Sequence, residues 1–502
     1  MSLKTKKNII IQAGGLGSRL GNRTKNKPKC LVEVSGKNIL DYSLEMFKED
    51  AIFIIADYKS EILRRYIKNF YNDLDITIIV TNHKGTSSGL REISKMISND
   101  NEILLMWSDL VLLNYPNFKI QSDIKIFTTD DVLCRYCEIN KKITKNTTTI
   151  NGIVGIFLFK NKEILGHIPL EGSLVSGWLM DNRQFSIDFE KIEGVKEFGT
   201  LDLVDKEKKN YNTRFFNKIE DLGDNFLIKM CIDDNYKHLQ EKEIFWYKFV
   251  NDKNFPFIPK IKSTDPLVIS KILGHHPYEK NGKREDLEKI IKSIKLLHNL
   301  KIQEYCKEDC SIEYQKKPIQ RVKSVCELLP FFNFEEIKIN GKKCSNPFHM
   351  KNIDNFMEKI DKIEIRNFSC IHGDPTFSNL LIDDKSCFLL DPRGYFGNKK
   401  IFGDPDYDWA KIYYSLCGNY DQLNMKNYEL EIINDYEINF IIKSNGWEHL
   451  EDDFFSLIDC KKEKIKLINS TIWFSLCGYI RNDYDSILIS FLKGVEIWND
   501  LL

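Results

Sequence analysis

The chain lacks an excess of charge of either sign: its 502 residues include 73 Lys and Arg and 73 Asp and Glu, a formal net charge of +0. A global basic field of the kind that attracts nucleic acid is therefore missing. The chain also lacks any run that approaches the ~20 apolar residues of a membrane-spanning helix. We accordingly expect small molecules as ligands, and neither nucleic acid nor a membrane as a partner.

Signs of secretion are also lacking. The 13 cysteines are scattered along a large chain, unlike the dense disulfide framework of small secreted domains. The N-terminal apolar run, residues 8–12, is too short for the core of a signal peptide. Cys134 and Cys137 have the spacing of zinc ligands, but no second pair of fitting spacing accompanies them. We expect a reduced, cytoplasmic protein, and the sequence leaves its oligomeric state open.

Residues 1–205 alternate short apolar runs with helical stretches. Strands are predicted at residues 8–12, 51–57, 76–81, 102–107, 150–160 and 201–205, and helices at 39–48, 59–70 and 89–97. This alternation predicts an α/β domain, with a parallel sheet covered by helices. The polar stretch 206–212 breaks the pattern, so we place a domain boundary after residue 212.

The remaining chain begins with strands and continues mostly as helices. A hairpin (214–219 and 226–231), a helix (236–250) and two further strands (257–261 and 266–272) predict a small antiparallel sheet with one helix, spanning residues 213–277. Residues 278–502 are predicted to be mainly helical, because apolar residues such as Leu287, Ile290, Ile294 and Leu297 recur at helical spacing. Residues 368–390 are the exception, with two strand-like runs.

Two motifs carry chemistry. Gly14, Gly15 and Gly17 follow the first strand, where missing side chains allow backbone N–H groups to approach phosphate oxygens. Arg19 and the lysines that follow it would supply charge to a pyrophosphate leaving group; these lysines are Lys25, Lys27 and Lys29. Near the other end of the chain stand Asp374, Asn379 and Asp391. Phosphoryl transfer from ATP needs such a set, with one carboxylate for the attacking hydroxyl and two groups for Mg²⁺.

The first motif lies in a longer pattern. The stretch from Ile11 to Gly21, followed by Lys27 to Val34, resembles the sugar-nucleotide pyrophosphorylase and phosphocholine cytidylyltransferase superfamily. The resemblance implies a Rossmann-like nucleotidyltransferase domain over about residues 6–205, with CTP as the expected nucleotide and UTP or dTTP as alternatives. It implies nucleotide binding by Ala13, Gly14, Gly15, Gly17, Ser18, Gly85 and Ser88.

The same resemblance assigns a metal and two catalytic cations. Asp109 and Glu197 occupy the places of the Mg²⁺ ligands, although the second ligand is usually Asp in this superfamily. Arg19 and Lys29 take the catalytic places beside the phosphates. A phosphate ester is already ionised, so the attacking group would need no general base.

The second motif resembles the aminoglycoside phosphotransferase and choline kinase family, relatives of protein kinases with a two-lobed α+β fold. The resemblance rests on His372-Gly-Asp374 with Asn379 and Asp391, and on the segment from Gly403 to Asp408. It implies that Asp374 orients the hydroxyl and that Asn379 and Asp391 bind Mg²⁺. Further roles follow from it for residues in the amino lobe. Lys229 would contact the ATP phosphates, and Glu243 would pair with Lys229, with Glu241 as the competing candidate. Residues 270–278 would form the hinge against adenine.

One histidine and two aspartates of the second motif are expected to be structural, namely His372, Asp404 and Asp408. Arg393, by contrast, is predicted to face the acceptor, since choline kinases carry an acidic residue just after the metal-binding Asp. A cation there would repel a quaternary ammonium. We therefore rank sugars and polyols above choline and ethanolamine as acceptors.

Together the motifs predict a bifunctional enzyme. The carboxy-terminal part would phosphorylate a small hydroxylated metabolite with ATP, and the amino-terminal part would couple the ester to a nucleotide for surface polysaccharide synthesis. Three alternatives stay open. They are a choline or ethanolamine kinase fused to a phosphocholine cytidylyltransferase, a single-activity metabolite kinase with a nucleotide-binding amino-terminal domain, and a nucleotide-sensing protein without turnover.

Overall fold

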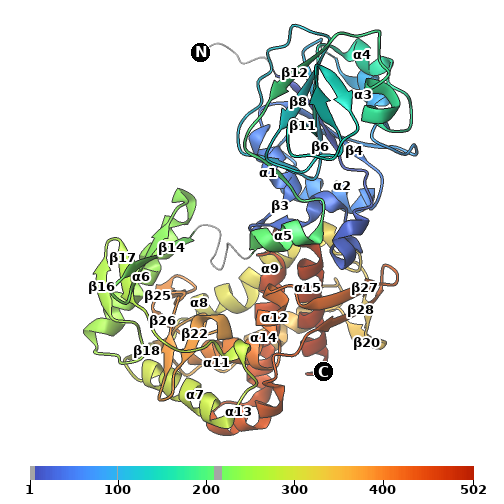
Figure 1. The fold of residues 1–502 in the computed structure, drawn as a ribbon. Coiled ribbons are helices and arrows are strands. Elements are labelled where there is room, and N and C mark those ends of the chain that lie inside the picture. The colour runs from blue at the N-terminus through green and yellow to red at the C-terminus, as the bar shows by residue number, and fades with distance from the viewer. Residues whose placement is uncertain (1–5, 99, 209–216) are drawn as a thin grey trace. The chain divides into compact units, whose positions relative to one another are not determined.

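A computed structural model describes residues 6–98, 100–208 and 217–502 (Figure 1). The chain divides into two compact units: the first comprises residues 1–212 with 482–484, and the second comprises 213–481 with 485–502. The predicted boundary after residue 212 and the start of the predicted hairpin at residue 214 lie outside the described residues. Within the described residues, no helix combines the length and the apolar character needed to cross a bilayer.

A nine-stranded mixed sheet forms the centre of the first unit, with the strand order β10-β9-β11-β6-β1-β4-β5 and with β8 and β12 attached through β11. Strands β1 (Asn8–Gln12), β4 (Ala51–Ala56), β5 (Ile76–Val80) and β6 (Ile103–Trp107) are mutually parallel. Strand β11 (Gly152–Phe159) is antiparallel to β6. The prediction of a Rossmann-like α/β domain is therefore confirmed. The prediction of a parallel sheet was wrong for β11, which is antiparallel to its neighbour β6.

Helices cover both faces of this sheet. Side chains alternate between the two faces along each strand, so strands that are apolar throughout need a covering layer on each face. Ile10 and Leu105 belong to a buried cluster that also contains Leu90 and Ile93 of α3 (Leu90–Met96). On the other face, the hydroxyl of Ser43 on α1 (Ile39–Met46) is 3.8 Å from the sulfur of Met106. The remaining elements of the unit are β2 (Glu33–Val34), β3 (Lys37–Asn38), α2 (Ser60–Phe70), β7 (Leu110–Leu112), β8 (Ile124–Thr129), β9 (Cys137–Ile139), β10 (Lys142–Thr144), α4 (Lys162–Gly166), β12 (Ile187–Lys191), β13 (Val195–Glu197) and α5 (Leu201–Lys208).

The last element corrects a sequence prediction. Residues 201–205 were predicted as a strand, but they begin the helix α5. Val204 is buried, whereas Leu201 and Leu203 keep 38% and 39% of their surface exposed. A strand would place Leu201 and Leu203 on one buried face, so the short apolar run was too ambiguous to separate strand from helix.

The second unit begins with a four-stranded antiparallel sheet in the order β14-β15-β17-β16. Strands β14 (Asn217–Gly223) and β15 (Phe226–Cys231) form the predicted hairpin, and the predicted helix is α6 (Lys237–Asp252). Strand β16 (Ile261–Thr264) begins where the prediction ended, because Pro256 and Pro259 cannot donate to a strand ladder. Strand β17 (Leu267–Ser270) completes the sheet.

The rest of the second unit is mainly helical, as predicted, with a further sheet that the sequence did not reveal. That sheet has the order β20-β19-β28-β27. The elements are α7 (Arg284–His298), β18 (Ile302–Glu304), α8 (Lys307–Ser311), α9 (Lys317–Lys323), β19 (Glu336–Ile339), β20 (Lys342–Ser345), α10 (Ile353–Asp361), β21 (Asn367–Cys370), β22 (Leu380–Ile382), β23 (Cys387–Leu389), β24 (Tyr395–Phe396), β25 (Lys399–Lys400), β26 (Phe402–Gly403), α11 (Pro405–Leu416), α12 (Tyr420–Asn424), β27 (Tyr428–Ile432), β28 (Glu437–Ile442), α13 (Glu451–Leu457), α14 (Lys462–Cys477) and α15 (Tyr484–Asn499).

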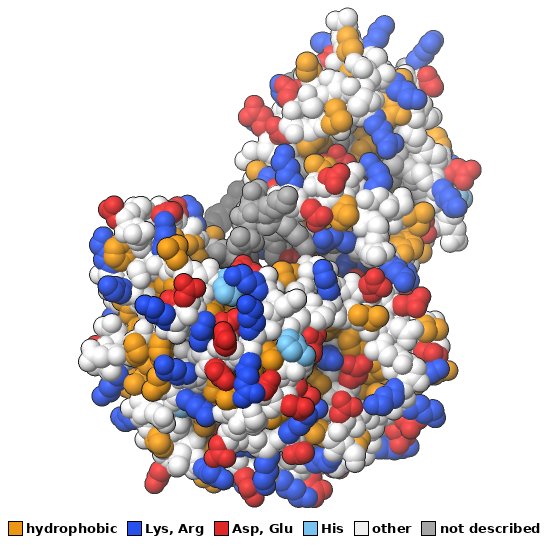
Figure 2. All heavy atoms as spheres, turned by 60° about the horizontal axis from the view of Figure 1, so that its bottom comes forward, with side chains coloured by type: hydrophobic (Ala, Val, Ile, Leu, Met, Phe, Trp, Pro, Cys, Tyr) orange, Lys and Arg blue, Asp and Glu red, His pale blue; other side chains and the backbone are white. Residues whose placement is uncertain are grey.

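Charged side chains of both signs are interspersed on the surface. In the face that Figure 2 shows, Lys and Arg alternate with Asp and Glu among the described residues. This pattern accords with the formal net charge of +0.

Candidate active sites

The glycine loop of the first unit follows β1 directly. It leaves the sheet after Ala13, whose N–H donates to the carbonyl of Ile55 at 2.8 Å. Gly17 has a φ of +66°, and a Cβ there would lie 2.9 Å from Cγ2 of Thr24. Both the conformation and the close approach therefore require glycine at this position. The neighbouring Gly15, Ser18 and Arg19 are exposed, so the loop is accessible to a ligand.

A second loop, residues 85–89, packs against the backbone of Gly172. Gly85 has a φ of +100°, and a Cβ there would lie 2.1 Å from the Gly172 carbonyl oxygen. Ser88, a predicted nucleotide ligand, is buried, and its hydroxyl donates to the His83 carbonyl at 2.9 Å. In this structure the Ser88 side chain therefore stabilises the loop itself. The amide of Gln12 donates to the Thr86 carbonyl at 2.5 Å and so connects β1 to this loop.

Two carboxylates and one ammonium group meet beyond the end of β6. The Nζ of Lys29 forms an ion pair with Oδ2 of Asp109. Glu197, at the end of β13, lies beside them: a Cβ on Gly199 would be 2.4 Å from Oε1 of Glu197 and 3.5 Å from Oδ2 of Asp109. The Phe198 N–H donates to the Asp109 carbonyl at 2.8 Å and holds the two segments together.

The charges of this cluster act on one another. Burial and the neighbouring Asp109 raise the pKa of Glu197, while Lys29 and Arg19 oppose this shift. Two adjacent carboxylates with oxygen donors are ligands that Mg²⁺ prefers, with nucleotide phosphates supplying further oxygens. Among the described residues, no group of three or more His, Cys, Asp or Glu side chains is arranged to hold a metal, so a metal here would rely on its substrate for the rest of its ligands.

Lys27 does not join this cluster, although its sequence position beside Lys29 predicted a role at the phosphates. Its side chain is buried, and its ammonium is 2.5 Å from Oδ1 of Asp483. A buried and paired ammonium has no reach to a phosphate in this structure.

In the second unit, the predicted lysine lies between two carboxylates. The Nζ of Lys229, on β15, is 2.9 Å from both carboxylate oxygens of Glu243 on α6 and 2.7 Å from Oδ1 of Asp391. Of the two candidates for its partner, Glu243 is buried and contacts Lys229, whereas Glu241 is exposed. Asp391 and Glu243 raise the pKa of Lys229 against its burial, so it stays charged.

Asp408 holds the backbone of the loop from His372 to Asp374. The Asp408 carboxylate accepts hydrogen bonds from the backbone N–H groups of His372 at 2.8 Å and Gly373 at 2.7 Å. It also lies 3.0 Å from Nε2 of His298. His372 is buried, its Nε2 is 2.8 Å from the Leu390 carbonyl, and burial lowers its pKa. The contacts of His372 and Asp408 are structural ones.

The carboxylate of Asp374, in the same loop, is partly exposed and has two side-chain partners. The Nδ2 of Asn379 donates to the Asp374 backbone carbonyl at 2.8 Å and to its Oδ2 at 3.2 Å. On the other carboxylate oxygen, Nζ of Lys411 lies 3.0 Å from Oδ1. Sequence reasoning missed Lys411. The available signal was its place three residues after Asp408 on α11, which puts both side chains on one helix face.

Arg393, which is predicted to face the acceptor, is paired in this structure. Its guanidinium forms an ion pair with Glu313 and donates to the hydroxyl of Tyr407 at 3.0 Å. The predicted hinge follows β17, and His275 in it exchanges two backbone hydrogen bonds with Ile382, at 3.0 and 2.9 Å. This contact connects the small sheet to the strand after the catalytic loop.

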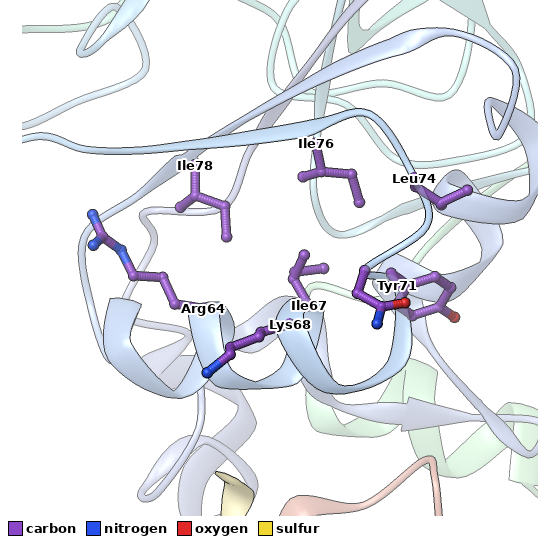
Figure 3. A pocket seen from close by; sticks show the side chains of 8 residues that line it. Arg64, Ile67, Lys68, Tyr71, Leu74, Ile76 and Ile78 are labelled. Atoms are coloured by element: carbon purple, nitrogen blue, oxygen red, sulfur yellow. The ribbon is translucent and has the colours of Figure 1, made fainter.

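A pocket of about 400 Å³ lies elsewhere, between α2 and β5 of the first unit (Figure 3). It is lined by Arg64, Ile67, Lys68, Tyr71, Asn72, Leu74, Ile76 and Ile78. This lining has no carboxylate and none of the residues described above, so the pocket is separate from both candidate sites.

Comparison with known proteins concerns the first unit most directly. Residues 9–117 match the MobA-like NTP transferase domain. The chain is 31% identical over 115 residues to CTP:phosphoglutamine cytidylyltransferase of Campylobacter jejuni, which covers 21% of this chain and 44% of that protein. It is 27% identical over 181 residues to D-glycero-alpha-D-manno-heptose 1-phosphate guanylyltransferase of the same organism, covering 32% of this chain and 79% of that protein. The chain thus spans less than half the length of the first relative.

Similar solved structures include two bacterial proteins. HddC from Yersinia pseudotuberculosis is 22% identical, with a TM-score of 0.36, and the match covers 41% of this chain and 99% of HddC. The CTP:phosphocholine cytidylyltransferase LicC from Streptococcus pneumoniae is 18% identical, with a TM-score of 0.33, covering 41% of this chain and 100% of LicC.

Proposed function

We propose that this chain is a bifunctional enzyme with two consecutive reactions. The second unit transfers the γ-phosphoryl group of ATP to a hydroxyl of a small metabolite. The first unit then couples the resulting phosphate ester to a nucleotide, with release of pyrophosphate. The activated product would serve surface polysaccharide synthesis.

The observation that carries the nucleotidyl transfer is the cluster of Lys29, Asp109 and Glu197 beside an accessible glycine loop. The match of residues 9–117 to an NTP transferase domain supports the same reaction. We propose CTP as the nucleotide because a cytidylyltransferase is among the relatives at 31% identity; the guanylyltransferase relative makes GTP the first alternative to test, beside UTP and dTTP.

In this reaction the ester phosphate attacks the α-phosphorus of the nucleotide, and the bond to pyrophosphate breaks. Backbone N–H groups of the loop from Gly14 to Gly17 would hold phosphate oxygens, and Arg19 and Lys29 would supply positive charge. Asp109 and Glu197 would hold Mg²⁺, which supplies neutralisation of the charge that develops on the phosphates. Lys29 would release Asp109 when the metal binds.

The observation that carries the kinase reaction is the convergence of Lys229, Glu243 and Asp391 in the same unit as the pair Asp374 and Asn379. Lys229 would hold ATP phosphates, and Glu243 would keep the ammonium in place. Asp374 would accept a hydrogen bond from the acceptor hydroxyl and aim its oxygen at the γ-phosphorus. The bond between the γ-phosphorus and the ADP oxygen then breaks. Asn379 and Asp391 would hold Mg²⁺, which would supply neutralisation of the phosphate charge.

One experiment tests both reactions. The protein is incubated with Mg²⁺, ATP, CTP and a panel of sugars, polyols, choline and ethanolamine, and ³¹P NMR follows the products. We expect a phosphate monoester to form first, and pyrophosphate together with a nucleoside diphosphate derivative of the alcohol to follow. Pyrophosphate release from an added phosphate ester, with no ATP-dependent ester formation from the alcohols, would refute the kinase half. Ester formation without pyrophosphate release, also when GTP, UTP or dTTP replaces CTP, would refute the nucleotidyl transfer.

A further inference from the structure

The ring of Tyr395 in the second unit lies close to two cations. The Nζ of Lys242, on α6, is 3.9 Å from the ring centroid, and the guanidinium carbon of Arg393 is 4.0 Å from it. Such contacts attract each cation to the ring electrons without neutralising its charge. Tyr395 therefore gathers two positive charges in one place.

A third cation and one anion complete this group. The buried carboxylate of Glu313 pairs with Arg393 and lies 2.9 Å from Nζ of Lys317. We call Lys242, Glu313, Lys317, Arg393 and Tyr395 the Arg393 cluster. It contains three cations and one carboxylate, so its formal charge is positive even though Arg393 itself is paired.

The pKa values of two members of the cluster, Tyr395 and Lys317, are lowered. Arg393, and then Lys317, lower the pKa of Tyr395 against its burial. Burial and then Arg393 lower the pKa of Lys317 to about 8, although Glu313 acts in the opposite direction. The shift of Tyr395 follows from positive charge that Glu313 does not fully offset. The shift of Lys317 follows first from its burial and only then from Arg393.

The cluster adjoins the catalytic loop. The Arg393 N–H donates to the His372 carbonyl at 2.9 Å, and a Cβ on Gly373 would lie 3.1 Å from Cβ of Arg393. The hydroxyl of Tyr407 accepts a hydrogen bond from Arg393 at 3.0 Å. The charge of Asp374 is among the causes that raise the pKa of Tyr407, after burial. The Arg393 and Lys317 side chains keep 12% and 26% of their surface exposed, so part of each side chain is open to solvent.

We propose that the acceptor of the kinase site carries an anionic group, a carboxylate or a phosphate, which the Arg393 cluster binds while Asp374 receives the hydroxyl. This inference rests on the proposed kinase reaction and narrows its substrate class. An anion would offset the excess charge of the cluster, whereas a quaternary ammonium would be repelled. Sugars and polyols without a charged group would lack this anchor.

A matched set of small alcohols tests the charge preference. Glycerol, glycerate, glycerol 3-phosphate and choline are compared as acceptors at saturating Mg²⁺ and ATP. We expect glycerate or glycerol 3-phosphate to have the highest kcat/KM, and the better of the two tells carboxylate from phosphate. For that acceptor, Lys317→Met should raise KM about tenfold, while Lys316→Met, at the exposed neighbouring position, should leave it unchanged. Glycerol or choline as the best acceptor would overturn the inference.

A binding measurement separates this inference from the kinase reaction. The phenol of Tyr395 is titrated by ¹³C NMR of ring-labelled protein, assigned with Tyr395→Phe, in acetate, inorganic phosphate or chloride at matched ionic strength. We expect acetate or phosphate to raise the pKa of Tyr395, since a bound anion disfavours the phenolate. If no alcohol in the set is phosphorylated, the kinase proposal fails on that result. An unchanged Tyr395 titration in both acetate and phosphate would overturn the anion site, whatever the kinase result.

Discussion

The ammonium of Lys411 lies 3.0 Å from Oδ1 of Asp374, while Asn379 donates to the other oxygen of the same carboxylate at 3.2 Å. The two side chains of the ion pair keep 15% and 18% of their surface exposed. A cation on one oxygen and an amide on the other fix the carboxylate in orientation. The position of Asp374 is therefore set by two elements, the catalytic loop and helix α11.

Asp374→Asn should abolish phosphorylation of the alcohol. An amide cannot accept the hydroxyl proton or keep the ion pair with Lys411, and the expected loss in kcat is roughly 10²–10⁴-fold. Nucleotide transfer to an added phosphate ester should be retained. Asp384→Asn, in the turn after β22, is the matched control; equal losses in both reactions of the Asp374 variant, with the fold intact by circular dichroism, would contradict separate sites.

Glu243→Gln should weaken the use of ATP. Without the Glu243 carboxylate, Lys229 keeps Asp391 as its charged partner at 2.7 Å. Asp391 is then less available as a ligand of Mg²⁺. We expect kcat/KM for ATP to fall roughly 10–100-fold and the Mg²⁺ requirement to rise. Initial rates at varied ATP and Mg²⁺ measure both. Glu241→Gln changes an exposed carboxylate two residues away and should behave like the unaltered protein; equal effects of the two variants would count against the assignment.

Asp109→Ala should stop the nucleotidyl transfer. It removes one of two carboxylates that would hold the metal and frees Lys29, and we expect pyrophosphate release to fall roughly 10²–10³-fold. ATP-dependent ester formation should survive. Pyrophosphate release is measured against Mg²⁺ concentration, with Asp188→Ala on β12 as the control. The same Mg²⁺ dependence in the Asp109 variant and the unaltered protein would rule out Asp109 as a ligand.

The affinity for an anionic acceptor should depend on Lys317 in alkaline solution. Its pKa is lowered to about 8 by burial and by Arg393, while Glu313 raises it and Tyr395 adjoins it. Lys317 therefore loses its charge as pH rises through about 8, and KM for the acceptor should increase above this pH. Lys317→Arg keeps the charge to a much higher pH, because a guanidinium does not titrate in this range. Identical pH profiles of KM for the two proteins would show that Lys317 is not the titrating group.

Asp408→Asn should destabilise the second unit. Asp408 is buried, and its Oδ2 accepts from the His372 N–H and lies beside His298, while its Oδ1 accepts from the Gly373 N–H. Asn keeps only one acceptor oxygen and places an NH2 donor in the other position, so at least one buried donor loses its acceptor. We expect a loss of about 3 kcal/mol in the free energy of unfolding, read as a lower denaturant midpoint of this unit. Asp452→Asn, at an exposed position of α13, is the control and should move the midpoint little. An unchanged midpoint for Asp408→Asn would mean that the loop is held by other contacts.

Features that depend on neighbours in the chain could be predicted from the sequence. The glycine loop follows β1 without a gap, and Asn379, the partner of Asp374, follows the loop from His372 to Asp374 a few residues later. The helical spacing of Leu287, Ile290 and Leu297 likewise identified their buried side on α7. In each case the backbone period or a short turn decides the geometry, so local residues carry the information.

The tertiary structure alone decided which distant groups meet. It placed Lys411 on Asp374 and paired Arg393 with Glu313, 80 residues earlier in the chain. It also put Glu243, the predicted partner, and not Glu241 against Lys229. These pairs depend on how helices α6 and α11 and the loop after β23 pack, which no local pattern specifies. Sequence order determines which residues are available, but packing determines which charges are close enough to interact, because the interaction energy depends on distance and on burial.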